Sequence, residues 1–446
     1  MLKRKIYSKL KDWKNNSNGK TALLISGARR VGKSHICREF AKNEYKSYIM
    51  IDFANTPKEI IDLIENESYN LDIFFLKLSA FYGVTLFERE SLIIFDEVQL
   101  LPRARQLIKY LVEDSRYDYL ETGSLLSIKR NVQNIVIPSE EKHIDMFPLD
   151  FEEFLWALGD NTTISIIENF FEKREALGQA LHKKVMNDFR QYLLVGGMPQ
   201  AVNEYLITKD FNKVDEVKRN ILTLYRNDIA KFAGSNQNKV LAIFDEIPGQ
   251  LSKKEKKYIL SSITKEARLR EYEDSFMWLD DAMITNTCFN STDPFVGLSL
   301  SSEHTTRKCY MADTGLLVTQ TFFDQDILDN NLYRDILFDK LSFNEGMLME
   351  NVVAQALRSN GYRLYFYSRN DKVNRENHIE IDSLISRNKK IIPIEVKSSS
   401  YRRHSSLDKF NQKFGKRIDH RVILYQKDIC VIDGVLHLPI YMVMFL

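Results

Sequence analysis

The sequence predicts an α/β fold whose central sheet is mostly parallel. Through the first 155 residues, apolar runs that are typical of buried strands alternate with helical patterns. A glycine-rich turn joins the first of these strands to a helix. Such alternation is typical of a parallel sheet with helices on both faces. Further strands are expected at 47–53, 91–97, 117–124 and 143–149.

The composition is that of a folded, modular protein. The 446 residues are 44% hydrophobic and 28% charged, which excludes a disordered or fibrous chain. The net charge of +2 is too small to indicate a nucleic-acid partner by itself. The four cysteines form no C-x-x-C pair, and there is neither a signal peptide nor an apolar run of about 18 residues. We therefore expect a cytoplasmic protein with no membrane partner, zinc site or disulfide.

A complete phosphate-binding motif follows the first strand. The residues that fit G-x-x-x-x-G-K-[ST] are Gly27, Ala28, Arg29, Arg30, Val31, Gly32, Lys33 and Ser34. The helix after the motif would direct free backbone N–H groups at a bound anion. We expect Lys33 to reach the β and γ phosphates and Ser34 to hold Mg²⁺.

Two carboxylates at the end of the run LIIFDE supply what hydrolysis needs beyond phosphate binding. Asp96 is expected to support Mg²⁺, and Glu97 to polarise the attacking water. Thr122 ends the next strand, where its hydroxyl would contact the γ-phosphate or the water. The sequence therefore predicts nucleotide hydrolysis with Mg²⁺ as cofactor.

ATP is favoured over GTP as the nucleotide. The string N-K-x-D at 212–215 resembles a guanine-reading motif, but it lies in a polar helical pattern. In addition, the segment after Asp96 lacks the glycine of a D-x-x-G motif. One sequence does not assign an arginine finger. The candidates are Arg103, Arg105, Arg130 and Arg226.

A second group of chemically active residues lies near the C-terminus. Glu395 and Lys397 are two positions apart on an apolar strand, so both project from one face. A turn at 386–390 would fold this strand against the one that carries Asp382 and bring the two carboxylates together. Such a pair would bind Mg²⁺ for phosphodiester hydrolysis, with Lys397 orienting the water and Glu350 completing the site.

The surrounding sequence is basic. From Arg387 to Arg421 there are eleven Lys or Arg and three Asp or Glu, with Tyr401, Phe410 and Phe414 interleaved. This pattern is typical of a surface that binds a DNA backbone. It is equally typical of a solvated basic helix, so both interpretations stay open.

Pattern and spacing divide the chain into four parts. A P-loop ATPase domain (1–155) is followed by a helical lid (156–237), whose helices are interrupted at Gly196, Gly197 and Pro199. A winged-helix-like module is expected at 238–335. The last part (336–446) combines a helix from 344 to 361 with three strand-like runs.

The motifs together resemble a family of bacterial and archaeal AAA-type ATPases whose C-terminal domain of unknown function looks like a restriction endonuclease. The stretches that carry the resemblance are SGARRVGKS, IIFDEVQ, ETGS, FPLDFEEF, GGMPQAV, YRNDI, YMADTGLL, ENVVAQAL, EIDSLIS and IPIEVKS. The resemblance implies an α/β restriction-endonuclease-like domain at the C-terminus. Asp382, Glu395 and Lys397 coincide with the D and E-x-K positions of that fold, and Glu350 coincides with its helical glutamate.

Two functions of different classes follow. The first is an ATP-driven enzyme that acts on DNA, in which the ATPase regulates or loads a metal-dependent nuclease. The second is a nucleotide-dependent switch whose C-terminal domain binds DNA or a protein partner without cleaving. Both include ATP and Mg²⁺, and both allow a homo-oligomer. They differ at Asp382, Glu395 and Lys397.

Overall fold

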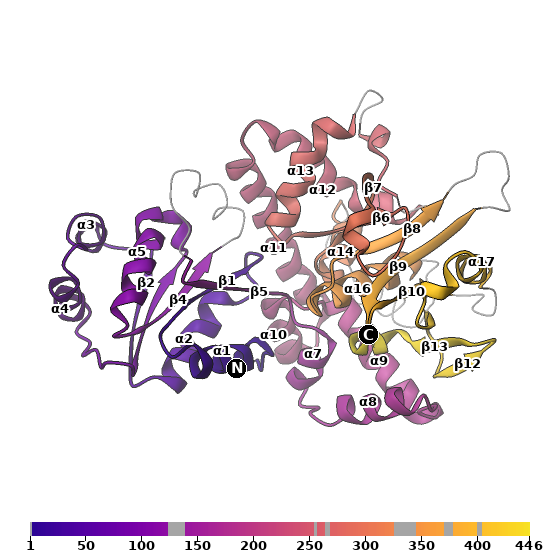
Figure 1. Ribbon diagram of the computed structural model, residues 1–446, viewed down its shortest axis with the longest axis horizontal. Coiled ribbons are helices and arrows are strands. Elements are labelled where there is room, and N and C mark those ends of the chain that lie inside the picture. The colour runs from indigo at the N-terminus through magenta and orange to yellow at the C-terminus, as the bar shows by residue number, and fades with distance from the viewer. Residues whose placement is uncertain are drawn as a thin grey trace. The chain divides into compact units, whose positions relative to one another are not determined.

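The computed structural model describes residues 2–123, 139–253, 257–263, 268–324, 345–369, 378–398 and 404–446. The chain forms two compact units, which are treated separately below (Figure 1). The first unit comprises residues 3–147 with 281–283, and the second comprises 148–280 with 284–446. Both units contain helices and a sheet, so the α/β class is confirmed.

The sheet of the first unit is parallel throughout, as expected. Its strands are β1 (Ala22–Gly27), β2 (Ser47–Asp52), β3 (Ser91–Asp96), β4 (Asp118–Gly123) and β5 (Glu141–Met146). Their order is β2-β3-β4-β1-β5, and every neighbouring pair is parallel. The strand before the phosphate loop is therefore separated from the strand that ends in Asp96 by β4 alone.

Helices cover both faces of this sheet (Figure 1). They are α1 (Ile6–Ser17), α2 (Lys33–Glu44), α3 (Lys58–Asn66), α4 (Leu71–Tyr82) and α5 (Pro102–Asp114), with a 3₁₀ turn at Val98–Leu100. Alternate residues of β1 serve the two faces, because successive side chains of a strand point to opposite sides. Leu24 packs in the core that includes α3, α4 and α5, whereas Leu23 and Ile25 pack with α1 and α2.

The second unit is helical along its first hundred residues, as expected. The helices are α7 (Phe151–Ala157), α8 (Thr163–Lys173), α9 (Gln179–Val195), α10 (Pro199–Thr208), α11 (Phe211–Phe232), α12 (Gln237–Leu251) and α13 (Leu269–Asp281). The expected interruption is confirmed, since α9 ends before Gly196 and α10 begins at Pro199. A proline is favoured at this first helical position because its missing N–H would have no partner there.

An eight-stranded sheet forms the rest of the second unit. Its strands are β6 (Thr285–Ser291), β7 (Ser302–Met311), β8 (Tyr365–Arg369), β9 (Ile379–Arg387), β10 (Lys390–Val396), β11 (Arg421–Tyr425), β12 (Cys430–Ile432) and β13 (Val435–Pro439). The helices along this part are α14 (Thr314–Thr321), α16 (Glu345–Ser359) and α17 (Ser405–Phe414). Short 3₁₀ turns lie at Gly234–Asn236, Leu260–Ser262, Leu298–Ser301, Gly415–Arg417 and Ile440–Phe445.

The strand order of this sheet is β12-β13-β11-β10-β9-β8-β6-β7. The hairpin expected at 386–390 is confirmed, with β9 and β10 antiparallel and Ile394 opposite Ser383. Strands β6 and β7, which lie in the segment expected to be a winged helix, extend this same sheet through the parallel pairing of β6 with β8. The sheet thus continues across residue 336, and the four-part division remains a prediction.

Three of the sequence motifs meet in the interior of the second unit. The Asp313 carboxylate accepts a hydrogen bond from the Gly197 N–H at 2.6 Å, and the Gly197 carbonyl accepts one from the Leu149 N–H at 2.7 Å. The buried Lys218 ammonium donates to the Leu194 carbonyl at 2.7 Å. These contacts join three of the sequence motifs to one another, namely FPLDF (147–151), GGMP (196–199) and DTGL (313–316). The role of these motifs is therefore structural.

Helix α16 is attached to the same place by amide side chains. The Asn351 side chain accepts from the Met311 N–H at 2.8 Å and donates to the Met311 carbonyl at 3.1 Å. The Gln355 side chain accepts from the Thr314 N–H at 2.9 Å and donates to the Tyr192 hydroxyl at 3.0 Å. Because buried amides need partners, these pairings fix the position of α16.

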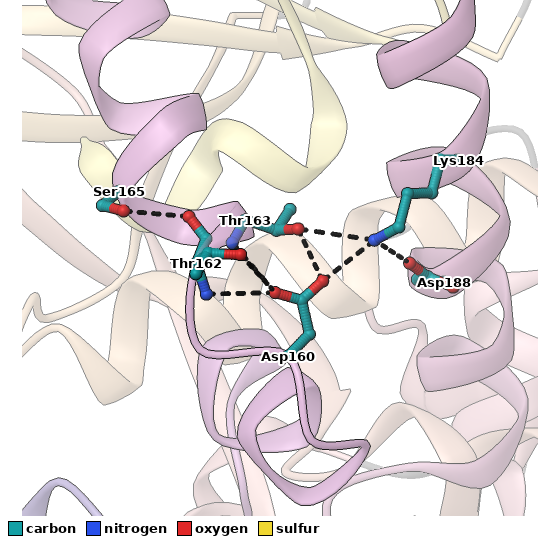
Figure 2. Close-up of polar contacts among 6 residues, drawn as sticks. All are labelled: Asp160, Thr162, Thr163, Ser165, Lys184 and Asp188. Atoms are coloured by element: carbon teal, nitrogen blue, oxygen red, sulfur yellow. Dashed lines mark hydrogen bonds and ion pairs between the residues drawn. The ribbon is translucent and has the colours of Figure 1, made fainter.

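The start of α8 is organised by one carboxylate (Figure 2). Asp160 accepts hydrogen bonds from the backbone N–H groups of Thr162 at 3.1 Å and Thr163 at 2.9 Å. Lys184 of α9 reaches the same carboxylate at 2.9 Å and also contacts Asp188 at 3.3 Å. Partial burial opposes ionisation of Asp160, but the hydrogen bonds from Thr163 and Lys184 outweigh it and hold the pKa well below its usual range.

Asp160→Ala is expected to lower the free energy of unfolding by about 1–2 kcal/mol at neutral pH, because it removes the acceptor of two N–H groups. A group with a lowered folded pKa stabilises the fold above its unfolded pKa of about 4, and this stabilisation is lost as the pH falls through the folded value. The difference from the wild type should therefore shrink in acid, as measured by urea unfolding at pH 7 and pH 3.

Asp188→Ala is the matched control for Asp160→Ala. It removes one partner of Lys184 but no backbone acceptor, so its cost should stay below about 0.5 kcal/mol. Equal losses in the two variants would show that the backbone hydrogen bonds contribute nothing.

Candidate functional site

The phosphate loop is shaped by two glycines and by the end of β5. Gly32 has φ of 101°, a left-handed conformation that glycine adopts without strain. A Cβ at Gly27 would lie 2.5 Å from the Met146 carbonyl oxygen, so no larger residue fits without a backbone shift. The two glycines thus let the loop turn sharply while it packs against β5.

Lys33 begins α2 and folds its side chain back into the loop. Its ammonium donates to the carbonyl oxygens of Gly27 at 2.9 Å and Ala28 at 3.1 Å, and the residue is only 7% exposed. Burial lowers the pKa of Lys33, and the nearby carboxylates of Glu97 and Asp96 oppose that effect. The ammonium is therefore held in the loop, next to the backbone that would surround phosphate.

Three elements bring oxygen atoms together beside the lysine. The Ser34 hydroxyl donates to Asp96 Oδ1 at 2.9 Å, and the Thr122 hydroxyl at the end of β4 donates to the same oxygen. Hydroxyl and carboxylate oxygens are the ligands that Mg²⁺ prefers. The pair Ser34 and Asp96 therefore fits the magnesium ion that the sequence predicts.

Glu97 follows Asp96 in a left-handed conformation, with φ of 55°. Its N–H donates to the Thr122 hydroxyl at 3.3 Å, and its carboxylate accepts a hydrogen bond from the Gln99 side-chain amide. Gln99 was not expected to contribute. The turn after β3 thus fixes the backbone of Glu97 and orients its carboxylate through Gln99.

Arg4 is a further residue that sequence reasoning missed. The residue is 8% exposed, and its guanidinium donates to the carbonyl oxygens of Val31 at 3.1 Å and Phe147 at 2.6 Å. It therefore ties the phosphate loop to the segment that follows β5. No motif marks this arginine, because its partners lie far away in the sequence.

Arg4→Met is expected to raise the KM for ATP roughly 5- to 30-fold while leaving kcat nearly unchanged. The change removes two hydrogen bonds to carbonyl groups, worth about 1–2 kcal/mol, without touching reacting atoms. Steady-state ATPase kinetics measure this split, and Lys9→Met, at an exposed lysine on α1, is the control. An unchanged KM would show that the loop keeps its shape without Arg4.

The arginine and guanine candidates have structural partners. Arg105 is buried and pairs with Glu141 at 2.8 Å, so it is not available as a finger in this arrangement. Arg226 pairs with Asp245 at 2.8 Å, and Arg130 lies outside the described residues. The N-K-x-D string lies at the start of α11, where buried Asp215 pairs with Arg219 at 2.7 Å, so this carboxylate already has a partner within the helix.

The hairpin of the second unit places the expected carboxylates on adjacent strands. Asp382 of β9 accepts a hydrogen bond from the Val396 N–H of β10 at 2.9 Å. Glu395 is 2% exposed and lies 3.2 Å from the Lys397 ammonium. Burial raises the pKa of Glu395 to about 7; the charge of Lys397 opposes this rise and that of Asp382 adds to it. Glu350 of α16 accepts from the Tyr310 hydroxyl at 3.3 Å.

A lysine that sequence reasoning missed lies among these carboxylates. Lys308 of β7 is 1% exposed, and its ammonium lies 3.4 Å from Glu380, 3.5 Å from Asp382 and 3.6 Å from Glu350. Burial lowers the pKa of this ammonium, but Tyr310 and the three carboxylates outweigh burial and raise it. The only sequence signal was a lysine two positions before Tyr310 in KCYMADTGLL.

The cluster as arranged does not fit the Mg²⁺ expected at Asp382 and Glu395. Within the described ranges, no group of three or more His, Cys, Asp or Glu side chains is arranged to hold a metal ion. Asp382 instead pairs with the Lys308 ammonium, and Glu395 pairs with Lys397.

The aromatic residues of the basic segment do not form a stacking surface. Phe410 and Phe414 are buried and contact the Tyr367 ring, with centroids 5.2 and 5.5 Å apart. These two rings belong to the core and do not line a DNA surface, whichever of the two interpretations of the basic segment holds. Tyr401 lies outside the described residues.

Family comparisons match three successive parts of the chain. Residues 19–155 match the AAA domain family. Residues 186–327 match a domain of unknown function (DUF8612), and residues 345–441 match another (DUF4143). No curated protein matches the sequence.

Several solved structures are similar at low identity. The Walker-type ATPase PABY2304 of Pyrococcus abyssi has 16% identity and a TM-score of 0.42, over 72% of this chain and 96% of that one. Orc1 of Aeropyrum pernix, solved with DNA, has 12% identity and a TM-score of 0.26, over 76% and 93%. Cdc6p of Pyrobaculum aerophilum has 10% identity and a TM-score of 0.22, over 75% and 93%.

The first unit has the P-loop fold of AAA-type domains. Its parallel sheet, its phosphate loop and the match to the AAA domain family agree on this class. The second unit adds an α/β domain whose family match names no activity. None of the helices in the described ranges has the length and apolarity needed to cross a membrane.

Proposed function

We propose that the chain binds ATP together with Mg²⁺ and hydrolyses it at the phosphate loop. The observation that carries this proposal is the convergence of Ser34, Asp96 and Thr122, three residues from separate elements whose oxygens meet beside the Lys33 ammonium. A glycine turn that bound nothing would not require a carboxylate and two hydroxyl groups at its mouth.

Each residue has a distinct task in this proposal. Lys33 exchanges its two loop carbonyls for phosphate oxygens, and the N–H groups at the start of α2 bind the same phosphates. Ser34 and Asp96 hold Mg²⁺, which neutralises charge on the phosphates when it is bound. Glu97 accepts the proton of the attacking water, while Thr122 fixes the Glu97 backbone and orients the Asp96 carboxylate.

Phosphate release from ATP and from GTP, with Mg²⁺ and after its removal by EDTA, tests the proposal. We expect release from ATP that requires Mg²⁺ and is several times slower with GTP. Bound ATP that is never hydrolysed, under any condition that keeps the protein folded, would contradict hydrolysis but not binding.

For the second unit, we propose DNA as the partner and metal-dependent phosphodiester cleavage as the first candidate activity. The E-x-K arrangement of Glu395 and Lys397, opposite Asp382 on a hairpin, supports this candidate. Mg²⁺- or Mn²⁺-dependent cutting of plasmid or branched DNA should then disappear in Asp382→Ala and Lys397→Ala. Absence of cutting on every DNA form, with the ATPase intact, would exclude it.

The second candidate is a nucleotide-dependent switch that binds DNA, a protein partner or another copy of the chain without cleaving. The position of Lys308 favours it, since an ammonium already pairs with the carboxylates. Fluorescence anisotropy of labelled DNA, with ATP and without, tests the DNA form of this candidate. An ATP-dependent change in affinity without cutting supports the switch, and identical affinities argue against it.

A further inference from the structure

We propose that Lys308 is the resident cation of the carboxylate cluster in the second unit, where its ammonium takes the place of a divalent metal ion. The sequence predicts Mg²⁺ at Asp382 and Glu395. The arrangement of the side chains leads instead to a cation that belongs to the chain. This inference bears on the candidate nuclease site and is independent of ATP hydrolysis in the first unit.

The geometry matches an ammonium. A lysine side chain carries three N–H donors. Three carboxylates surround Lys308, at 3.4 Å for Glu380, 3.5 Å for Asp382 and 3.6 Å for Glu350. They come from β9 and α16, whereas the lysine comes from β7. One carboxylate is therefore present for each donor, and the ammonium offsets part of their negative charge without any added ion.

The strand that carries Lys308 is fixed on both sides of the lysine. The Arg307 carbonyl accepts a hydrogen bond from the Tyr258 N–H at 2.8 Å. Met311 exchanges two hydrogen bonds with the Asn351 side chain. Strand β7 also pairs with β6 along most of its length, including Lys308 opposite Cys288. The backbone that carries Lys308 is therefore held by contacts that do not depend on the charge of the ammonium, while its ion pairs direct the ammonium to the carboxylates.

A divalent ion cannot share this position with Lys308. Mg²⁺ needs oxygen ligands at about 2.0–2.1 Å, and a buried ammonium among the same carboxylates repels it at short range. Removing only the ammonium would leave three partly or fully buried carboxylates close together without its positive charge, which is unfavourable because like charges repel one another. Such a cluster would take up a cation from solution, so replacing Lys308 should create the metal site that the wild type lacks.

Lys308→Met tests this inference, because methionine keeps an unbranched apolar side chain and removes the charge. Mn²⁺ is the probe, measured by electron paramagnetic resonance on the full chain without nucleotide. We expect Lys308→Met to bind one additional Mn²⁺ at least tenfold more tightly than any site in the wild type, which corresponds to about 1.4 kcal/mol. The midpoint temperature of thermal unfolding should also rise with Mn²⁺ concentration in this variant, whereas that of the wild type should not.

Two controls separate this result from a general loss of positive charge. Lys397→Met removes the neighbouring lysine, which is 30% exposed and pairs with Glu395, but leaves Lys308 in place, so it should gain no Mn²⁺. Adding Asp382→Asn to Lys308→Met should remove the new site, since Asp382 supplies one of its ligands.

Two results would overturn the inference. The first is Mn²⁺ binding by the wild type that disappears in Asp382→Asn, because it would place a metal ion where Lys308 lies. The second is a folded Lys308→Met protein that binds no additional Mn²⁺. If Lys308→Met does not fold, Mn²⁺ binding by the wild type and by Asp382→Asn still tests the inference. The inference requires equal binding by these two proteins, and weaker binding by Asp382→Asn would contradict it. Loss of ATP hydrolysis in any of these proteins would concern the first unit only.

Discussion

Lys33→Ala should bind ATP roughly 10²- to 10³-fold more weakly than the wild type. The ammonium is directed into the loop through its contacts with the Gly27 and Ala28 carbonyls, and two charge-assisted hydrogen bonds to phosphate are worth about 3–4 kcal/mol. Isothermal titration with a non-hydrolysable ATP analogue and Mg²⁺ measures the loss. Lys42→Ala, at the exposed end of the same helix, should bind as the wild type does. If Lys33→Ala bound ATP as tightly as the wild type, the phosphate loop would not be the nucleotide-binding site.

Glu97→Gln should separate binding from turnover. The amide keeps the size and the contact with Gln99 but cannot accept the proton of the water, so kcat should fall by about 10²- to 10⁴-fold with the affinity unchanged. Single-turnover hydrolysis measures the chemical step directly. Full activity in this variant would assign the base to another residue.

Gly197→Ala should prevent the second unit from folding stably. A Cβ at this position would lie 2.1 Å from the Leu149 carbonyl oxygen and 2.7 Å from its nitrogen, so the backbone must separate where FPLDF meets GGMP. The shift would also break the hydrogen bonds of Gly197 with Asp313 and Leu149. We expect a loss of at least about 3 kcal/mol in the free energy of unfolding.

Tryptophan fluorescence reports this unit selectively. Trp156 and Trp278 lie in the second unit and Trp13 in the first, so urea unfolding in a Trp13→Phe background follows the second unit alone. Gly249→Ala is the control, because a Cβ in the interior of α12 meets no atom closer than 3.8 Å and alanine favours a helix by about 1 kcal/mol. Similar unfolding midpoints for the two variants would contradict a tight contact at Gly197.

Much of the first unit could be predicted because its signals are local. The phosphate loop is a continuous string, and β3 is an apolar run that ends in Asp96. The hairpin of β9 and β10 was predictable for the same reason, since its turn lies between two strand-like runs. Features that depend on one short segment, such as the phosphate loop and this hairpin, could therefore be predicted from the sequence alone.

Contacts across long sequence separations were not predictable. Arg4 reaches Phe147, and Lys308 reaches Asp382, without any spacing that marks the pair. The burial of Phe410 and Phe414 was predictable, because together with Leu407 they recur at helical spacing, which indicates the buried face of an amphipathic helix. The basic residues between these positions suggested a nucleic-acid surface, so the helical spacing of the apolar residues was not used.

The pairing of β6 with β8 has a practical consequence for isolating the C-terminal domain. A fragment that begins at residue 336 would lack β6 and β7 and would leave β8 as an unprotected edge strand, open to pairing with other chains. The fragment would also lack Lys308 and expose the carboxylates with which it pairs. Aggregation or metal binding by such a truncated protein would result from the truncation and would not be a property of the native domain. A fragment that keeps the native sheet has to start before β6.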